Sequence, residues 1–411
     1  MELYRKTLSC GAKFIGCDFA GTKPNLALGL LVPRGSAHDP AELEGSHHFL
    51  EHLLFKSKQN SLRNELARMI EDHGGNWNAW TDYLHTVVHC TLAQDQADIG
   101  VSFLTELANR SPEFSPQNLG IERKVIYREI ERANDDPAEL VSSLAHNELY
   151  LPPFAGPILG TKESVERMTT TDMLHLWQKG YSPSHFTIVA VGKVNFNDLA
   201  GEFESRLEKS SLNGNGQGDS EGIIIQPQEK GCRTVIKEGL EQCHFGFATH
   251  TPFPSDHLFN AFILLDTYLT EGTFSELNYT IRERRGEAYG VEGELDCGRG
   301  YGLYVVKAGI SPHKVKEIYD LIREGFNSAI HMEERELDRL KIMARGREDN
   351  TEFDKEDLMT HLLRREDDGR GAESFFRINE DYERISLDQI RYVANIREPT
   401  IVTISPGDFP A

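Results

Sequence analysis

Hydrophobic positions along the chain fall into short strand-like runs and longer helical repeats. The run Leu26–Val32 is continuous and apolar, as in a buried strand, and Ser46 follows a loop at the position of a helix N-cap. Asn76–Asp82 and His85–Leu92 are strand-like segments with a short gap between them, and this spacing predicts a β-hairpin. The pattern therefore predicts a strand, a helix and a hairpin, in that order, near the N-terminus.

A polar, glycine-rich stretch divides the sequence almost in half. Residues 210–222 cannot bury enough apolar area to fold alone, so they are expected to form a linker. Each half repeats one order of elements, with strands first, then amphipathic helices, then a closing strand such as Phe186–Val191 or Thr400–Ile404. The sequence predicts an α+β protein of two related α/β sandwich domains, each an antiparallel-rich sheet packed with helices, over 1–209 and 223–411.

The composition is that of an acidic protein with enough apolar residues for large cores. Of 411 residues, 39% are hydrophobic, and 65 acidic against 44 basic side chains give a formal charge of −21. Such a surface repels phosphate backbones and anionic lipid, so neither nucleic acid nor a membrane is an expected partner. The N-terminus carries no signal-like segment, so a cytoplasmic, bacterial location is expected. Six cysteines without a C-x-x-C pair are expected to be buried, reduced thiols.

Two histidines and a glutamate at helical spacing indicate metal-assisted hydrolysis. A helix turns by about 100° per residue, so His48 and His52 lie on one face and can share a metal ion. Neutral imidazoles suit Zn²⁺, which in hydrolytic sites has three protein ligands and one open position. Glu51 is better placed to take a proton from water than to bind metal, and is assigned as general base. The neighbouring His47 is about 140° from His52 and is expected to cap the helix or be partly exposed.

The third metal ligand is expected to be an acidic residue on another rigid element. Ser115 followed by Pro116 predicts the start of a helix that continues to Arg132. This helix carries Glu122 and Glu129, which are seven apart and therefore on one face. Glu129 is favoured as the ligand, which leaves Glu122 to orient a histidine or polarise the water. Either glutamate alone would be an ordinary helical surface residue, and only the joint pattern favours a metal centre.

Several segments resemble one known family. HHFLEHLLFKS resembles the G-x-x-H-F-L-E-H-x-x-F-K signature of the pitrilysin, insulinase and mitochondrial processing peptidase family, the inverzincins. GGNWNAWTDYLHTVV, ERKVIYREI, PILGTKESVERM and YSPSHFTIVAVGKV resemble further family segments in the same order. EGLEQCHFGFATHTP and IRERRGEAYGV resemble a strand of the family's second domain and its Arg-x-x-x-x-Gly-x-x-Tyr element. The resemblance covers nearly the whole chain.

The resemblance implies two related domains per chain and a peptide hydrolysed at zinc inside a closed chamber. It implies that Asn78 and its strand bind the substrate backbone as an added strand. It also implies that Arg282 and Tyr289 hold the substrate or stabilise the oxyanion. In family members of this length the metal site and the Arg/Tyr element face one another across two chains. A homodimer, or a heterodimer with a related subunit, is therefore expected.

The favoured interpretation is an active zinc endopeptidase that cleaves short or unfolded peptides, because the base and all three ligands are intact. One alternative is a catalytically silent subunit, as the resemblance to core subunits of respiratory bc complexes would allow. Another is a zinc-bearing chain that works only with a partner, as in proteases that trim leader peptides. Trp77, Trp80 and Tyr83 are expected either to line a peptide groove or to pack on the sheet.

Overall fold

One mixed sheet carries the N-terminal half of the chain. The computed structural model describes residues 2–56, 67–68, 70–109, 114–210, 212, 223, 225–228, 231–350 and 353–407. Within these ranges, six strands form the first sheet in the order β1-β2-β6-β3-β5-β4. They are β1 Leu3–Thr7, β2 Lys13–Asp18, β3 Asn25–Val32, β4 Asn76–Thr81, β5 Thr86–Ala93 and β6 Thr187–Gly192. Strands β2 and β6 run parallel, and all other neighbours run antiparallel.

A second sheet repeats this topology in the C-terminal half. Among the described residues its order is β7-β11-β8-β10-β9, and only β7 and β11 run parallel. These strands are β7 Cys232–Ile236, β8 Cys243–His250, β9 Ala288–Gly298, β10 Tyr301–Ile310 and β11 Thr400–Ser405. Apart from β1, every strand of one sheet has a counterpart at the same place and in the same direction in the other. The predicted α+β class, with two related α/β units, is therefore confirmed.

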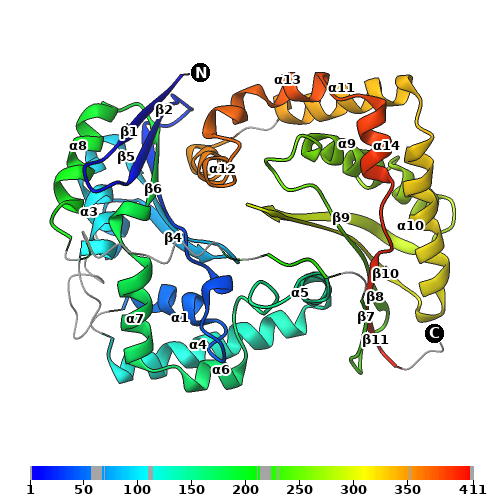
Figure 1. Cartoon of the computed structure of the whole chain (residues 1–411), viewed down its shortest axis with the longest axis horizontal. Helices are drawn as coiled ribbons and strands as arrows, with labels where there is room; N and C mark the ends of the chain where they lie inside the picture. Colours follow the sequence, from blue (N-terminus) through cyan, green and yellow to red (C-terminus); the bar gives the residue numbers. More distant parts are fainter. Residues whose placement is uncertain are drawn as a thin grey trace.

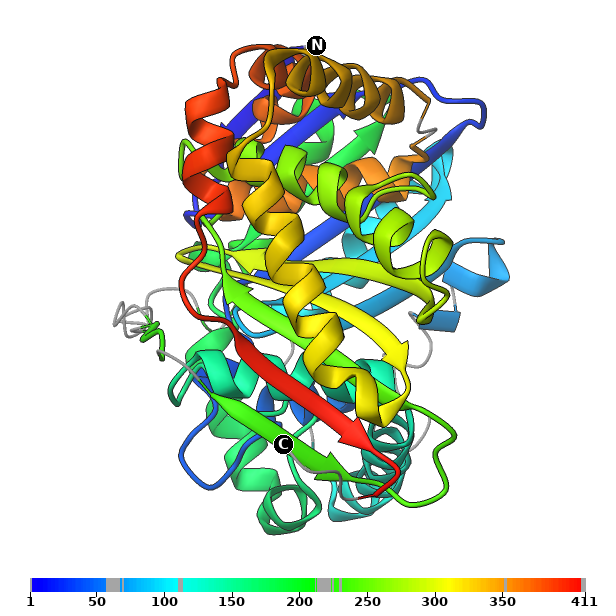
Figure 2. The ribbon, with the colours of Figure 1, turned by 90° about the vertical axis from the view of Figure 1, so that its right-hand side faces the viewer.

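Helices pack around both sheets (Figure 1). In the N-terminal half they are α1 Ser46–Leu54, α3 Ala97–Asn109, α4 Pro116–Asp135, α5 Pro137–Leu149, α6 Lys162–Arg167, α7 Thr170–Gly180 and α8 Phe196–Leu207. In the C-terminal half they are α9 Phe259–Leu269, α10 Val315–Ile330, α11 Glu334–Asn350, α12 Lys355–Asp367, α13 Ile378–Glu383 and α14 Leu387–Ala394. Figure 2 looks onto the C-terminal half, where α10 crosses in front of the second sheet.

Short 3-10 and π-helical turns complete the described secondary structure. The 3-10 turns are η1 Ser36–His38, η2 Gln94–Gln96, η3 Pro183–His185, η5 Pro312–Lys314 and η6 Ala372–Arg377. The π-helical turn η4 spans Asn278–Glu283 and precedes β9. It contains Arg282 of the predicted Arg/Tyr element.

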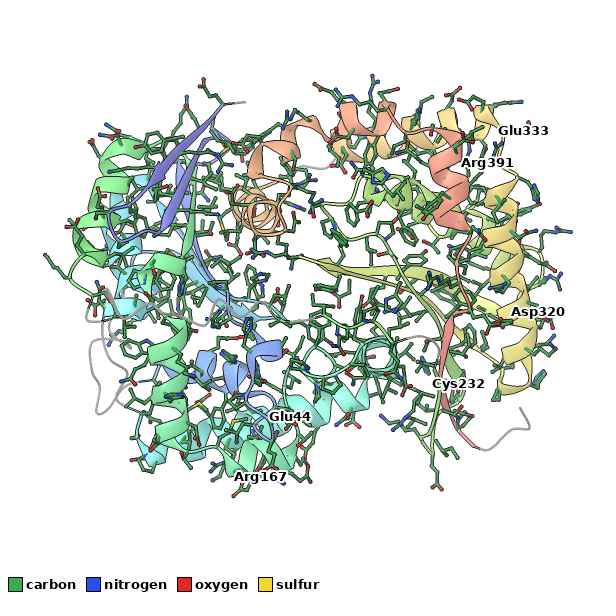
Figure 3. All side chains as sticks on the ribbon, in the orientation of Figure 1. Glu44, Arg167, Cys232, Asp320, Glu333 and Arg391 are labelled. Atoms are coloured by element: carbon green, nitrogen blue, oxygen red, sulfur yellow. The ribbon has the colours of Figure 1, made fainter. Side chains whose placement is uncertain are left out.

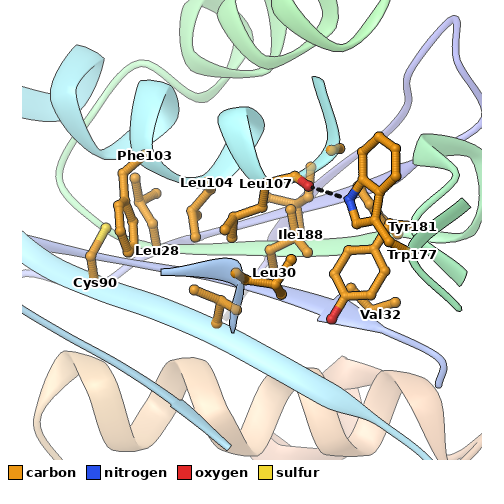
Figure 4. Close-up of a cluster of buried hydrophobic side chains, with 14 of the residues drawn as sticks. Leu28, Leu30, Val32, Cys90, Phe103, Leu104, Leu107, Trp177, Tyr181 and Ile188 are labelled. Carbon is orange, nitrogen blue, oxygen red and sulfur yellow. Dashed lines mark hydrogen bonds between the residues drawn. The ribbon is translucent and has the colours of Figure 1, made fainter. Parts of the chain in front are cut away.

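The main core of the N-terminal half lies on one face of the first sheet (Figure 4). Leu28, Leu30 and Val32 alternate along β3 and point into this core, where they meet side chains of α3 and α7. Trp177 of α7 is 1% exposed, and its indole nitrogen donates a hydrogen bond to the Leu107 carbonyl at 3.0 Å. This bond satisfies the one polar group that the indole brings into the core.

Each half of the chain contributes one helix to the sheet of the other half. Helix α12 packs the apolar residues Leu358, Met359, Leu362 and Leu363 against the opposite face of the first sheet. Helix α5 packs in return against the second sheet, through Val141, Ala145 and Leu149. Figure 1 shows α12 beside the strands of the N-terminal half. Strand β3 is therefore buried on both faces, which explains why its apolar run is continuous.

Other sequence predictions have different outcomes. The predicted hairpin is formed by β4 and β5, whereas the linker predicted over 210–222 lies outside the described residues except for Ser210 and Leu212. All six cysteines are free thiols, but only Cys17, Cys90 and Cys243 are buried as predicted; Cys10 and Cys297 are half-buried and Cys232 is exposed. Figure 3 labels it at the outer edge of the C-terminal half. Within the described ranges, the chain contains no helix with the length and apolar character needed to cross a membrane.

Candidate metal centre

Helix α1 is held at its start by a buried carboxylate. Gly45 is the N-cap residue, with φ at 85°, so the predicted N-cap Ser46 is instead the first helical residue. The Asp39 carboxylate accepts hydrogen bonds from the Gly45 amide at 2.6 Å and from the Ser46 hydroxyl at 2.7 Å. It also accepts one from the His47 amide at 2.9 Å, and the His47 ring Nδ1 lies 2.7 Å away. His47 is 3% exposed, so the prediction of partial exposure is wrong. Its ring is buried because it packs beside the Asp39 carboxylate.

The structure brings His48, His52 and Glu129 together. The two imidazole Nε2 atoms lie 3.2 Å apart. The Glu129 Oε2 atom lies 3.6 Å from the His48 Nε2 and 3.5 Å from the His52 Nε2. The three atoms form a nearly equilateral triangle between α1 and α4, and each can act as a metal ligand.

The size of this triangle fits a tetrahedral zinc ion. Zinc–ligand bonds of about 2.0–2.2 Å at tetrahedral angles place neighbouring ligand atoms about 3.3–3.5 Å apart. The observed separations of 3.2, 3.5 and 3.6 Å bracket that range. The Glu129 Oε2 atom is buried without a hydrogen-bond donor among the described residues. A cation would satisfy an oxygen and two imidazole nitrogens that otherwise crowd one another.

Glu122 fixes the orientation of His52 from the far side of the ring. Its Oε2 atom lies 3.1 Å from the His52 Nδ1, and because a carboxylate can only accept, Nδ1 carries the hydrogen. The lone pair of Nε2 then faces the His48 and Glu129 ligand atoms. The Lys56 ammonium lies 2.9 Å from the other Glu122 oxygen. The sequence does not predict Lys56 as part of this centre, because α1 ends at Leu54 and its helical spacing does not extend to Lys56.

The buried charges of the centre shift one another's pKa values. Burial and the neighbouring His52 lower the pKa of His48 to about 4, which keeps its imidazole neutral. Burial also opposes protonation of His52, but the hydrogen bond to Glu122 and the nearby Glu129 carboxylate outweigh it and raise the pKa of His52 to about 9. The same ring lowers the pKa of the Glu129 carboxyl. The ligand atoms of His48, His52 and Glu129 therefore converge at one point. A cation bound there can replace the proton that these groups otherwise share.

Glu51 lies in the same cavity but outside the ligand triangle. It is 8% exposed, and burial raises the pKa of its carboxyl above the usual value. The Thr81 hydroxyl, at the end of β4, donates a hydrogen bond to the Glu51 Oε2 atom at 2.8 Å. The Thr81 hydroxyl also lies 3.3 Å from the Thr86 hydroxyl, which holds it in place. The bond from Thr81 therefore orients the Glu51 carboxylate. Sequence analysis missed Thr81, since no local spacing relates it to a residue thirty positions earlier.

A cavity of about 790 Å³ connects these groups to strand β4. Its lining includes the three ligand residues, Glu51, Glu122 and the side chains of β4. Asn78 lies in the middle of β4, which is the last strand of the first sheet and, among the strands that the structure describes, pairs only with β5. Trp77 and Trp80 also line the cavity, while Trp77 packs on Phe55 with ring centroids 4.5 Å apart. Trp77 and Trp80 therefore line the cavity as well as packing on neighbouring rings, and a role in binding peptide stays a prediction. Tyr83 instead stacks on His146 at 3.8 Å.

Arg282 and Tyr289 do not reach the metal centre within this chain. Neither residue lines the cavity that holds the ligand triangle. The Arg282 guanidinium lies over the Tyr289 ring, 5.4 Å from its centroid. Tyr289 is 92% exposed, and Phe274 on the preceding loop is 80% exposed. The structure thus brings the two residues to each other but leaves both exposed to solvent.

The sequence of the chain matches the models of two known protein domains. Residues 20–162 match the model described as Insulinase (Peptidase family M16), and residues 167–343 match the one described as Peptidase M16 inactive domain. The chain belongs to peptidase family M16. The first match contains the ligand triangle and Glu51, whereas the second contains Arg282 and Tyr289. Family membership supports a peptidase-type function.

Relatives in this family come from several bacteria. The chain is 28% identical over 325 residues to an uncharacterized zinc protease of Mycobacterium leprae, which covers 78% of this chain and 72% of that protein. It is 27% identical over 335 residues to an uncharacterized zinc protease of Streptomyces coelicolor, which covers 78% of this chain and 70% of that protein. These names suggest a metallopeptidase.

Solved structures share the fold over the whole chain. A protease from Helicobacter pylori superposes with a TM-score of 0.88 at 18% identity, covering 98% of this chain and 99% of that one. A chain of Complex III2 from Candida albicans superposes with a TM-score of 0.82 at 14% identity, covering 98% of this chain and 96% of that one. At these identities the likeness establishes the fold alone.

Proposed function

We propose that the protein is a zinc-dependent endopeptidase that hydrolyses short or unfolded peptides. The observation that carries this proposal is the triangle of His48, His52 and Glu129 ligand atoms, with the buried carboxylate of Glu51 in the same cavity. His48, His52 and Glu129 would hold the zinc, and the fourth position would stay open towards the cavity. When bound, zinc supplies Lewis-acid chemistry, which makes a water molecule more acidic and polarises a peptide carbonyl.

The residues of the chain supply the proton transfers and the positioning. Glu51 takes a proton from the attacking water and can pass it to the leaving amine, a role that suits a carboxyl whose pKa is raised by burial. Thr81 aims the Glu51 carboxylate through its hydroxyl. Glu122, backed by Lys56, keeps the His52 ring in the tautomer that presents Nε2 to the metal.

The edge of β4 would bind the substrate main chain. Strand β4 has its free edge beside the cavity, and backbone groups at a free edge can pair with an extended peptide. Asn78 is exposed on this strand, and its side-chain oxygen accepts a hydrogen bond from the Ala79 amide at 2.9 Å. The side-chain amide group can therefore point to a bound peptide. Recognition through the backbone favours unfolded segments over any one sequence.

A second chain would complete the site. Arg282 and Tyr289 belong to the substrate-holding set by resemblance, yet they lie outside the metal cavity and are open to solvent. A homodimer, or a heterodimer with a related subunit, would bring Arg282 and Tyr289 of one chain to the cavity of the other chain. A Tyr289→Ala variant mixed with a Glu51→Gln variant tests this arrangement. If the mixture of the two inactive proteins regains activity, the result supports a site shared between chains. If the mixture stays inactive, the result contradicts it.

A catalytically silent subunit, or one that depends on a different partner for leader-peptide trimming, is the alternative function. The fold likeness to a chain of Complex III2 is the observation that favours silence. The intact ligand set and the buried base favour catalysis, because a silent subunit has no need to keep four interacting polar groups together, two of them buried and two half-buried.

The decisive experiment measures zinc content, native mass and peptide cleavage on one purified sample. Wild type is expected to bind about one zinc per chain and to lose activity with a chelator. Glu51→Gln is expected to keep its zinc while its rate falls by about 10²–10⁴. Glu129→Gln is expected to lose zinc affinity. A Glu51→Gln protein that cleaves as fast as wild type would end the proposal, and wild type that binds zinc but never cleaves alone would favour the silent or partner-dependent subunit.

A further inference from the structure

Arg365, in the last turn of α12, is buried without an acidic partner. The residue is 9% exposed. Its guanidinium donates a hydrogen bond to the Ser374 hydroxyl at 3.1 Å and lies 5.5 Å from the centroid of the Phe375 ring. Among the described residues no carboxylate lies within 4.0 Å of it. Arginine is rarely buried unless it is paired, so this side chain calls for a counter-charge.

The surroundings of Arg365 disfavour the charged form of its guanidinium, which has no counter-charge beside it. Burial lowers the pKa of the guanidinium to about 10, and the nearby Arg370 pushes it in the same direction. Asp368 opposes this shift but is already engaged by Arg370, with one nitrogen–oxygen distance of 3.0 Å and another of 2.5 Å. The Asp368 carboxylate is therefore committed to a different guanidinium.

Arg365 lines a polar cavity of about 340 Å³ between α12, η6, α13 and the loop before α9. Donor side chains dominate this cavity, with Ser374 beside Arg365, Arg377 on its exposed rim, and Ser255 and Asn260 opposite. These helices lie along the upper part of Figure 1. The cavity shares no lining residue with the metal centre.

The acidic residues of this cavity are paired with a different arginine. Glu380 lies 3.8 Å and Asp381 lies 3.6 Å from the Arg384 guanidinium. Of the four arginines that line the cavity, Arg370 and Arg384 therefore have carboxylate partners. Arg365 and Arg377 form no ion pair within the described ranges. A local excess of positive charge is unusual on a chain with a formal charge of −21.

We propose that this cavity is a binding site for a compact oxyanion, the phosphate or carboxylate group of a small metabolite, held by Arg365, Arg377 and Ser374. Guanidinium groups bind both kinds of oxyanion through paired N–H···O bonds. The Ser374 hydroxyl, which accepts from Arg365 and donates to the Gly371 carbonyl at 2.8 Å, can turn its hydrogen from that carbonyl to a bound anion. Bound there, the anion joins the end of α12 to η6. Because α12 packs on the first sheet, occupancy of this site would stabilise the contact between the two halves.

The test is titration calorimetry of the full-length protein with inorganic phosphate and, separately, with succinate. Both titrations use a buffer free of other oxyanions at constant ionic strength, with chloride as the control salt. Arg365→Met keeps an unbranched apolar side chain in the buried position and removes the charge. Arg377→Gln changes an exposed residue and is expected to leave folding intact. It therefore keeps the test possible if Arg365→Met does not fold. Arg345→Gln, at an exposed position outside the cavity, is the matched control.

Saturable binding of either anion to wild type and to Arg345→Gln is expected, with affinity lower by about 30-fold or more in Arg365→Met. A smaller loss is expected in Arg377→Gln. Phosphate binding would identify a phosphorylated ligand, and succinate binding alone would identify a carboxylate. The anion is also expected to raise the melting temperature of wild type but not of Arg365→Met. The proposal is overturned if neither anion binds, if both variants bind as wild type does, or if chloride has the same effect.

Discussion

The hydrogen bond from Thr81 to Glu51 offers the most direct test of how the base is positioned. Thr81→Val removes the hydroxyl but keeps the shape of the side chain, so strand β4 and its pairing with Thr86 are retained. The Glu51 carboxylate then loses the donor that lies 2.8 Å from its Oε2 atom. The carboxylate stays buried but can rotate away from the attacking water.

The magnitude follows from the type of bond that is lost. A hydrogen bond to a charged group contributes about 1.5–3 kcal/mol, and each 1.36 kcal/mol in the barrier is about tenfold in rate. If the bond holds Glu51 in its reactive orientation, kcat is expected to fall by about 10–150-fold. This loss is smaller than the one expected for Glu51→Gln, because the base itself remains.

The assay is steady-state cleavage of a fluorogenic peptide, with zinc content measured on the same samples. Thr81→Ser keeps the hydroxyl and is expected to retain most of the activity. The loss in Thr81→Val is expected in kcat rather than in KM, and zinc content is expected to stay at the wild-type value, because Thr81 does not contact a ligand residue. If Thr81→Val matches Thr81→Ser in kcat, the hydroxyl does not position the base and the reasoning fails.

Three further predictions concern the metal centre and the contact between the halves. Lys56→Met removes the ion pair at 2.9 Å that steadies Glu122, and zinc affinity is expected to fall by about tenfold in a competition titration; exposed Lys124→Met is the control. Leu362→Ala, at a fully buried position of α12, is expected to lower the free energy of unfolding by about 2–5 kcal/mol in a urea titration; exposed Ile342→Ala is expected to change it by less than about 0.5 kcal/mol. Burial opposes protonation of His85, but Asp82 and Asp367 outweigh it and raise its pKa to about 10, so its stabilising contribution is complete below about pH 6.5 and is lost as the pH rises to 10. His85→Gln is therefore expected to flatten the fall in unfolding free energy over that range.

Each of these predictions can fail clearly. Equal zinc affinity in Lys56→Met and Lys124→Met would show that Glu122 needs no support. A loss below about 1 kcal/mol for Leu362→Ala would contradict close packing of α12 on the first sheet. A pH profile of unfolding that is identical in wild type and His85→Gln would show that His85 gains no proton affinity in the folded protein.

Local periodicity in the sequence determined the elements and part of the metal centre. His48 and His52 share a helix face because they are four residues apart, and this geometry holds wherever the helix packs. The apolar run of β3 and the hairpin of β4 and β5 are equally local features. The repeated order of elements also indicated two related units, because strand pairing follows largely from the order of strands along the chain.

Tertiary structure decided which distant residues meet. The exchange of α5 and α12 between the halves left no mark in local spacing, because an apolar helix face does not specify which sheet it will cover. The same holds for Thr81 beside Glu51 and for Lys56 beside Glu122, which are joined only when separate elements pack. Arg365 appears in the sequence as one charge among many. Only the folded chain shows that it is buried, that the Asp368 carboxylate is engaged by Arg370, and that it lines a cavity.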